Sequence, residues 1–207
     1  AQGIQTTATI MCGHVERYEH IARHLLRIRR LQSKTMGFSE FVILPFVHME
    51  APIYLKGSSR KGLTLRETVL VHAISRLALN PYFRNIQASW TKLGHGLLRT
   101  CLQAGVNDLG GTLMNETITR AAGASHGEET APREMERIIL SIGRKPRQRT
   151  TNYGEVSELN RARSFVAGTL EEPKYSVVKK YERKKKTEKR SLYRPGLEGK
   201  ITGADIV

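Results

Sequence analysis

Cysteine is scarce in this sequence, with only Cys12 and Cys101 among 207 residues. Two thiols exclude a disulfide scaffold and a metal site of four thiolates within the chain. Long apolar runs are also missing, since no stretch approaches the roughly 18 to 20 residues that span a bilayer. The first residue is Ala rather than Met, and no basic-then-apolar signal pattern follows it. We therefore expect a cytoplasmic chain with no membrane partner that is incomplete at its N-terminus.

Acidic residues are few beside basic ones: 19 Asp and Glu against 34 Lys and Arg give a formal net charge of +15. Residues 174–200 hold eleven Lys and Arg against three Glu, so this stretch carries +8. Such a block buries too little apolar surface to offset its ordering entropy. We predict a folded region at residues 1–150 and a basic disordered tail at 151–207. The tail is either a solvated segment or a tether for nucleic acid or another acidic partner.

Short β-branched or apolar runs alternate with helical patterns along the first 150 residues. Strand-like runs occupy residues 6–11, 41–47, 85–90 and 105–109. Helical spacing of apolar residues occurs at 19–32, 64–80, 97–103, 115–122 and 132–142. Thr64 and Glu67 have the form of a capping box at the start of the second helix. The alternation predicts βα units around a parallel sheet, and thus an α/β fold.

The two faces of the predicted strands differ in polarity. Ala8, Ile10 and Cys12 form an apolar face of the first strand, as Ile86 and Ala88 do in the third. A doubly wound sheet needs two apolar faces, whereas polar inward faces suit a barrel that holds a polar ligand. One of the adjacent residues Asn107 and Asp108 must also point inward if the fourth strand continues. Polar residues on the opposite faces are Thr7, Thr9, Gln87 and Ser89.

Polar side chains also follow each predicted strand, where a barrel carries its active site. They are His14, Glu16, His48, Glu50, Lys92, Thr112 and Glu116. Each histidine has an alternative role as a structural imidazole that caps a strand end. Gly110 and Gly111 are compatible with a phosphate cradle or with a tight turn. The spacing of His and Cys residues predicts no metal site, because the sequence has no HExxH motif and no closely spaced pair of cysteines.

Six segments together resemble a known enzyme family: TTATIMCGHVE, FVILPFVHMEAP, NIQASWTKLG, AGVNDLGGTLMNE, RAAGASHGEE and GRKPRQRTTNYG. They resemble the C-terminal half of the radical S-adenosylmethionine enzymes that build the deazaflavin chromophore. The pattern is most similar to the 4-hydroxybenzyl transferase half of 7,8-didemethyl-8-hydroxy-5-deazariboflavin synthases. The resemblance covers roughly residues 3–154. Menaquinone-pathway enzymes share parts of it.

This resemblance implies transfer of a 4-hydroxybenzyl group from tyrosine to 5-amino-6-(D-ribitylamino)uracil, with S-adenosylmethionine and a 4Fe-4S cluster as cofactors. The family holds its cluster on a CxxxCxxC motif, which this chain lacks. The four predicted strands then correspond to strands five to eight, the C-terminal half of a TIM-type radical S-adenosylmethionine barrel. We expect the cluster-binding N-terminal half to lie elsewhere, in cis or in trans, and this chain alone to be inactive.

Roles for the polar residues follow from this interpretation. His14 and His48 are the candidate catalytic residues, as a proton relay. Glu16 and Glu50 are candidates to contact the amino group of tyrosine. The candidates for hydrogen bonds to the uracil ring or its ribityl chain are Gln87, Ser89, Asn107, Asp108 and Thr112. Two alternatives remain: a fragment of a menaquinone-pathway enzyme, or a basic module that binds nucleic acid through residues 144–149 and the tail.

Overall fold

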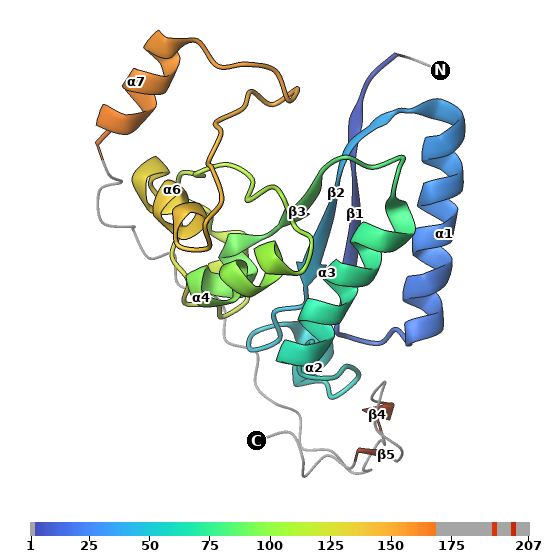
Figure 1. Cartoon of the computed structure of the whole chain (residues 1–207). Helices are drawn as coiled ribbons and strands as arrows, with labels where there is room; N and C mark the ends of the chain where they lie inside the picture. Colours follow the sequence, from blue (N-terminus) through green and yellow to red (C-terminus); the bar gives the residue numbers. More distant parts are fainter. Residues whose placement is uncertain (1–2, 169–191, 194–199, 202–207) are drawn as a thin grey trace.

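The computed structural model describes residues 3–168, 192–193 and 200–201 and shows a mixed α/β fold with a small parallel sheet (Figure 1). The strands are β1 (Thr6–Cys12), β2 (Phe38–Pro45) and β3 (Ile86–Ala88), with a separate short pair β4 (Leu192–Tyr193) and β5 (Lys200–Ile201). The helices are α1 (Tyr18–Thr35), α2 (Pro52–Leu55), α3 (Leu65–Leu79), α4 (Trp90–Gln103), α5 (Ile118–Ala121), α6 (Pro132–Leu140) and α7 (Glu158–Val166).

The main sheet has the order β1-β2-β3, and both strand pairs are parallel. The fourth predicted strand, at residues 105–109, was wrong in extent, because it forms only an isolated parallel bridge between Gln87 and Asp108. Gly105 and Gly110, at the two ends of this segment, have positive φ angles of 111° and 75°. These angles lie outside the range of an extended strand, so the strand cannot continue past either glycine. The short segment therefore extends the sheet by one bridge beyond β3.

Helices cover one face of this sheet. Ala8, Ile10 and Cys12 of β1 are buried, whereas the intervening Thr7, Thr9 and Met11 are exposed. The buried face joins the core formed with α1, α3 and α4, and Figure 1 shows α3 in front of the strands. The predicted alternation of β1 is thus confirmed.

Local signals set both boundaries of α3 as predicted. Thr64 Oγ1 accepts a hydrogen bond from the Glu67 backbone N–H at 3.2 Å, and the Thr64 N–H donates to Glu67 Oε2 at 2.7 Å. This confirms the capping box of α3, which ends at Leu79, before the C-cap Asn80 and Pro81.

Two other helices differ from their predicted extents. The helix predicted at 115–122 contains only α5, because Leu113 and Asn115 have positive φ angles that interrupt a helix. The helix predicted at 97–103 begins earlier, at Trp90, and is kinked at Gly94.

Residues 151–168, where a disordered tail was expected, include the helix α7. Ser157 Oγ accepts a hydrogen bond from the Asn160 N–H at 3.3 Å and so caps this helix, which packs against α6. Most of the basic run at 174–200 lies outside the described residues. The boundary between residues 150 and 151 stays a prediction.

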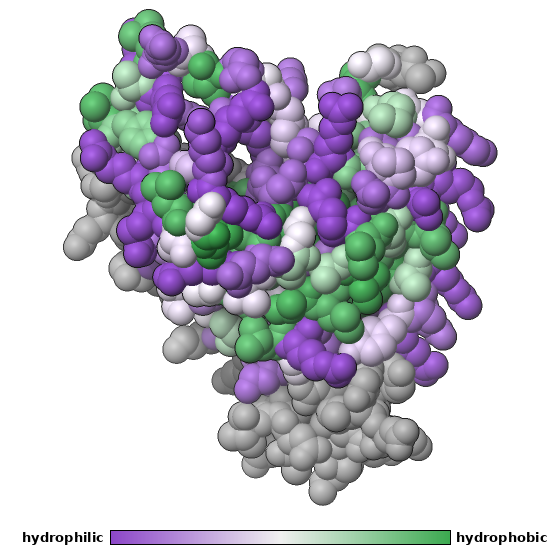
Figure 2. All heavy atoms as spheres, in the orientation of Figure 1, coloured by the Kyte–Doolittle hydropathy of each residue, from purple (hydrophilic) through white to green (hydrophobic). Residues whose placement is uncertain are grey.

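The surface seen in Figure 2 carries an apolar patch where α3 faces the solvent. Leu70, Ile74 and Leu77 of α3 contribute, with 40%, 44% and 78% of their surface exposed. Among the described helices, none combines the length and the apolar character that crossing a membrane requires.

Candidate functional site

The carboxyl ends of β2 and β3 both contact the loop at residues 111–130. The backbone N–H of Glu50, after β2, donates to Ala122 O in this loop at 3.0 Å. A Cβ atom at Gly123 would lie 2.5 Å from the Cβ of Met49, so only glycine permits this close approach. The loop that follows Asp108 therefore crosses to the end of β2.

After β1, Glu16 is held by several donors at once. Its carboxylate accepts hydrogen bonds from the backbone N–H groups of Gly13 (2.5 Å) and His14 (3.0 Å). Its Oε2 also lies 2.9 Å from His14 Nδ1, and Arg60 Nη2 lies 3.3 Å from its Oε1. Buried Arg60 bridges Glu16 to Glu67 Oε1, which lies 2.8 Å from its Nη1. Glu16 is thus saturated with donors, and it orients the half-buried ring of His14.

The electrostatics of this group keep both carboxylates ionised. Burial would raise the pKa of Glu16, but the backbone N–H groups of the turn and the charge of Arg60 hold that pKa below its ordinary value. The pKa of Glu67 is lowered in the same way, against the effect of burial, by Thr64 and Arg60. The group therefore carries two negative charges and one positive charge beside His14.

After β2, the ring of His48 packs edge-on against Tyr54 with 4.6 Å between ring centroids. Burial and the nearby charge of Lys61 lower the pKa of His48, so its imidazole is neutral near pH 7. The side chain of Glu50 makes no hydrogen bond with any described residue. The neutral imidazole and the unpaired carboxylate are both suited to receive a proton or a cationic group.

After β3, Lys92 is the centre of a group of hydroxyls. Its Nζ donates to Thr119 Oγ1 at 2.8 Å, and Thr119 Oγ1 donates to Glu116 Oε1 at 2.9 Å. Thr91 Oγ1 lies 3.1 Å from Ser89 Oγ and 3.5 Å from Thr119 Oγ1. Burial lowers the pKa of Lys92, and the charge of Glu116 opposes this only in part. Ser89, a predicted substrate-binding residue, thus belongs to a polar group that also contains the ammonium group of Lys92.

The sheet face opposite the helices carries a second group of charges. Arg149 Nε lies 2.6 Å from Asp108 Oδ2, and its Nη2 lies 3.1 Å from Asp108 Oδ1 and 3.5 Å from Glu40 Oε2. Its guanidinium also lies 4.0 Å above the ring centroid of Tyr153, whose hydroxyl donates to Glu40. Burial and the hydrogen bond to Glu40 raise the pKa of Tyr153, so its phenol stays protonated. Asp108 is therefore neutralised by Arg149.

Three predicted substrate-binding residues, Gln87, Asn107 and Thr112, lie in different places. Gln87 is on the same face as Asp108, against Gly110. Asn107 is turned away from this face: its Oδ1 accepts from Arg76 Nη2 at 2.6 Å and from the Ile86 N–H at 2.9 Å. Thr112 accepts the Thr130 N–H through its backbone oxygen at 2.9 Å. The structure brings Gln87 and Asp108 together and separates Asn107 from them.

The two cysteines do not form a metal site. Both thiols are fully buried, and burial raises the pKa of each to about 12, so they are protonated at neutral pH. Across the described residues, no cluster of three or more His, Cys, Asp or Glu side chains is arranged to hold a metal ion. These residues therefore do not fit the ligand set of an iron–sulfur cluster.

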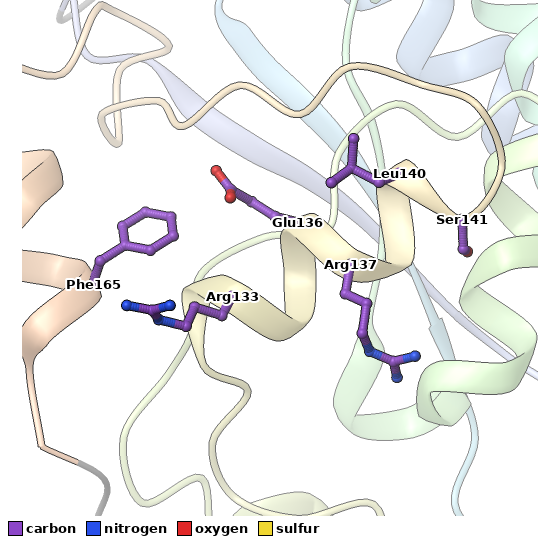
Figure 3. Close-up of a pocket in the computed structure, with 6 residues that line it drawn as sticks. All are labelled: Arg133, Glu136, Arg137, Leu140, Ser141 and Phe165. Carbon is purple, nitrogen blue, oxygen red and sulfur yellow. The ribbon is translucent and has the colours of Figure 1, made fainter.

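A groove of about 620 Å³ lies between α6 and α7 (Figure 3). Phe165 of α7 faces Arg133 and Glu136 of α6 across it. Glu136 is already paired with Arg161 Nη2, at 3.0 Å. None of the predicted site residues lines this groove, so it is not the candidate site.

Sequence reasoning missed Glu40, Arg149 and Tyr153 as members of a group. Two signals were available: the carboxylate of Glu40 directly before the strand-like run at 41–47, and the segment GRKPRQRTTNYG, which was interpreted for its family resemblance and its basic charge. Neither signal shows that the two meet, because 109 residues separate Glu40 from Arg149.

Comparison with known proteins gives consistent matches. The family described as the CofH/MqnC C-terminal region matches residues 35–162. An FO synthase of Nocardia farcinica is 49% identical over 154 residues, which cover 74% of this chain and 18% of that protein. A 5-amino-6-(D-ribitylamino)uracil–L-tyrosine 4-hydroxyphenyl transferase of Methanothermobacter thermautotrophicus is 48% identical over 157 residues, 76% of this chain and 43% of that protein. The corresponding transferase of Methanopyrus kandleri is 51% identical over 154 residues, 74% of this chain and 42% of that protein.

This chain thus spans about a fifth of the FO synthase and about two fifths of each transferase.

Proposed function

The chain belongs to the CofH/MqnC C-terminal region family, and on this basis we propose that it forms the substrate-holding half of a radical S-adenosylmethionine transferase. The reaction is transfer of the 4-hydroxybenzyl group of tyrosine to 5-amino-6-(D-ribitylamino)uracil, in the synthesis of a deazaflavin chromophore. The names of the similar proteins, FO synthase and tyrosine 4-hydroxyphenyl transferase, support this assignment.

The observation that carries the proposal is the one-sided sheet. Helices bury the face of Ala8, Ile10 and Cys12, whereas Thr7 and Gln87 lie on the other face. A parallel sheet in a closed barrel has this arrangement, with helices outside and side chains filling the interior. In the proposal, β1, β2, β3 and the segment around Asp108 are strands five to eight, and a cluster-binding half, in cis or in trans, completes the barrel.

The contacts separate the candidate residues that we propose to contact a substrate from those that internal partners already hold. Gln87, Ser89 and Thr112 are proposed to hydrogen-bond the uracil or its ribityl chain, since amides and hydroxyls both donate and accept. His14 and His48 are proposed to move protons, and Glu50 to pair with the amino group of tyrosine. Glu16 and Asp108 are saturated by neighbouring donors, so they act as positioning residues. The side chain of Asn107 points away from Gln87 and Asp108, and its Oδ1 accepts hydrogen bonds from Arg76 and from the backbone of β3.

The cofactors of the complete enzyme are proposed from the family. When bound, S-adenosylmethionine and a 4Fe-4S cluster would supply the radical that attacks tyrosine. The thiols of Cys12 and Cys101 do not fit as cluster ligands, because they are buried and protonated. The role of this chain is then to orient the substrates, exclude water and hold protons.

A hybrid enzyme tests this function. Residues 3–168 replace the matching region of the Nocardia farcinica FO synthase, which is 49% identical, and the purified hybrid is loaded with its cluster. We expect fluorescent deazaflavin to form from tyrosine and ribitylaminouracil under reducing conditions. A folded, cluster-loaded hybrid that cleaves S-adenosylmethionine without forming this product would refute the proposal. Product from a menaquinone precursor instead would favour the second enzyme class.

The nucleic-acid alternative gains little from the described residues. Arg149, in the basic segment 144–149, is committed to Asp108 and Glu40 and is not free for phosphate. The lysine-rich part of that prediction lies mostly outside the described residues. Nucleic-acid binding therefore stays a prediction for the tail and for the exposed residues Arg144, Lys145 and Arg147.

A further inference from the structure

Lys92 has no role in the assignments above, although it lies at the centre of the strand ends. It follows β3 in the first turn of α4, and its Nζ reaches Thr119 in the loop that also contacts Glu50. Lys92 is therefore placed between the end of β3 and the loop at residues 111–130, which also contacts the end of β2.

The ammonium group of Lys92 is oriented but not neutralised. It donates one hydrogen bond, to Thr119 Oγ1, and two further N–H donors remain. No carboxylate of the described residues lies within 4.0 Å of it, because Glu116 is directed to Thr119 instead. A half-buried cation with unused donors is a favourable site for an anionic group.

We propose that Lys92, held by Thr119, binds the carboxylate of the amino-acid substrate. The proposal rests on the proposed function, in which tyrosine is that substrate. Tyrosine carries an ammonium group and a carboxylate on one carbon, so it needs an anion and a cation close together. Glu50 and Lys92 supply this pair from two neighbouring strand ends, since the loop at 111–130 contacts both segments.

Glu116 and Thr119 act on Lys92 as positioning residues. Thr119 Oγ1 donates its proton to Glu116 Oε1 at 2.9 Å, so its lone pairs are directed to Lys92. Glu116 Oε1 and Oε2 also lie 3.1 and 3.2 Å from the Thr119 backbone nitrogen, and this fixes the threonine in place. The chain Glu116–Thr119–Lys92 thus holds the cation before the substrate arrives.

The test compares the binding of L-tyrosine with that of tyramine, which lacks the carboxylate. Calorimetry uses the cluster-loaded hybrid without reductant, so that no turnover is needed. The unsubstituted hybrid should prefer tyrosine by about 10- to 100-fold, the usual effect of one charge-assisted hydrogen bond. Lys92→Met should remove this preference, Lys92→Arg should restore part of it, and the exposed Lys34→Met should leave it unchanged.

The outcomes separate this inference from the proposed function. A folded Lys92→Met hybrid that still prefers tyrosine over tyramine would overturn the role of Lys92. Weaker binding of S-adenosylmethionine with unchanged binding of tyrosine would overturn it too, because the carboxylate would then belong to the cofactor. Lys92→Gln provides a second uncharged variant if the methionine variant does not fold. A hybrid that prefers tyrosine yet forms no deazaflavin would count against the proposed function alone.

Discussion

Arg149 makes a two-point contact with Asp108, with Nε 2.6 Å from Oδ2 and Nη2 3.1 Å from Oδ1. The contact joins the segment after α6 to the face of the sheet that the helices leave uncovered. The Asp108 side chain is 7% exposed and the Arg149 side chain 25% exposed, so water screens the pair only in part. Residues 144–154 are thus fastened across this face rather than extended from it.

The first prediction concerns this pair. Arg149→Met should lower the free energy of unfolding by about 1–3 kcal/mol, because it leaves the carboxylate of Asp108 buried without its partner. Chemical denaturation measures the change. Arg147→Met is the matched control, since Arg147 pairs with Glu155 at the surface and should change stability by less than about 0.5 kcal/mol. Equal effects of the two substitutions would show that the Asp108 contact contributes little.

The second prediction concerns the turn after β1. Gly13 has a φ of +106°, and an added Cβ would lie 2.7 Å from Leu63 N and 2.9 Å from Gly62 C. Gly13→Ala should therefore destabilise the fold by about 2–5 kcal/mol, through backbone strain and overpacking. Gly96→Ala, within α4 where nothing lies near the added Cβ, should stabilise it by about 0.5–1 kcal/mol. Thermal melting of both variants tests the pair, and an unchanged midpoint for Gly13→Ala would contradict the geometry.

The third prediction concerns pH. His72 is fully buried, and burial lowers its pKa although Thr68 O, 2.7 Å from Nδ1, favours the charged form. Above pH 6.5 the imidazole is mostly neutral in both the folded and the unfolded chain, so His72 adds little pH dependence to the free energy of unfolding. Below pH 6.5 the unfolded chain binds a proton that the folded chain does not bind. Stability should thus fall with pH below about 6.5, by at most about 1.4 kcal/mol per pH unit for this group.

His72→Leu should flatten this fall without abolishing it, because burial also lowers the pKa of His24 and His48. Urea unfolding between pH 7.5 and 5.5, in steps of about half a unit, measures the slope. The exposed His126→Leu variant is the control and should keep the slope of the unsubstituted chain. Parallel profiles for all three proteins would rule out a contribution from His72.

The fourth prediction concerns the thiols. Cys12 and Cys101 have pKa values of about 12 and no exposed surface, so a thiol reagent at neutral pH should react slowly with the folded chain. In denaturant both should react rapidly. Absorbance of the released chromophore follows the two rates. Rapid labelling of the folded chain at either cysteine would show that its burial is not maintained in solution.

Several features of the fold could be predicted from neighbouring residues. The alternation in β1 identified its buried face, because side chains in a strand point to opposite sides in turn. Thr64 and Glu67 predicted the start of α3, since both capping hydrogen bonds form within four residues. The fourth strand and the helix at 115–122 were predicted too long, because positive φ angles at Gly105, Gly110 and Asn115 leave no trace in apolar spacing.

The candidate site was predicted only in part. The polar residues after each strand were identified, but Glu16 and Asp108 are already occupied by internal partners. One of the adjacent residues Asn107 and Asp108 was predicted to point inward, and both were candidates to contact the substrate; Asn107 is turned to Arg76 and the Ile86 N–H instead. Which of the two faces inward depends on Arg76 and Arg149, which lie 31 and 41 residues away.

The amino-acid order alone determined which residues alternate, where α3 is capped, that only two thiols exist and which family the segments resemble. The tertiary structure decided that Lys92 meets Thr119, that Arg149 neutralises Asp108 and that Asn107 turns outward. The physical reason is range: periodicity and capping depend on residues within one or two turns. A hydrogen bond between residues 27 or 41 apart depends on the path of the whole intervening chain.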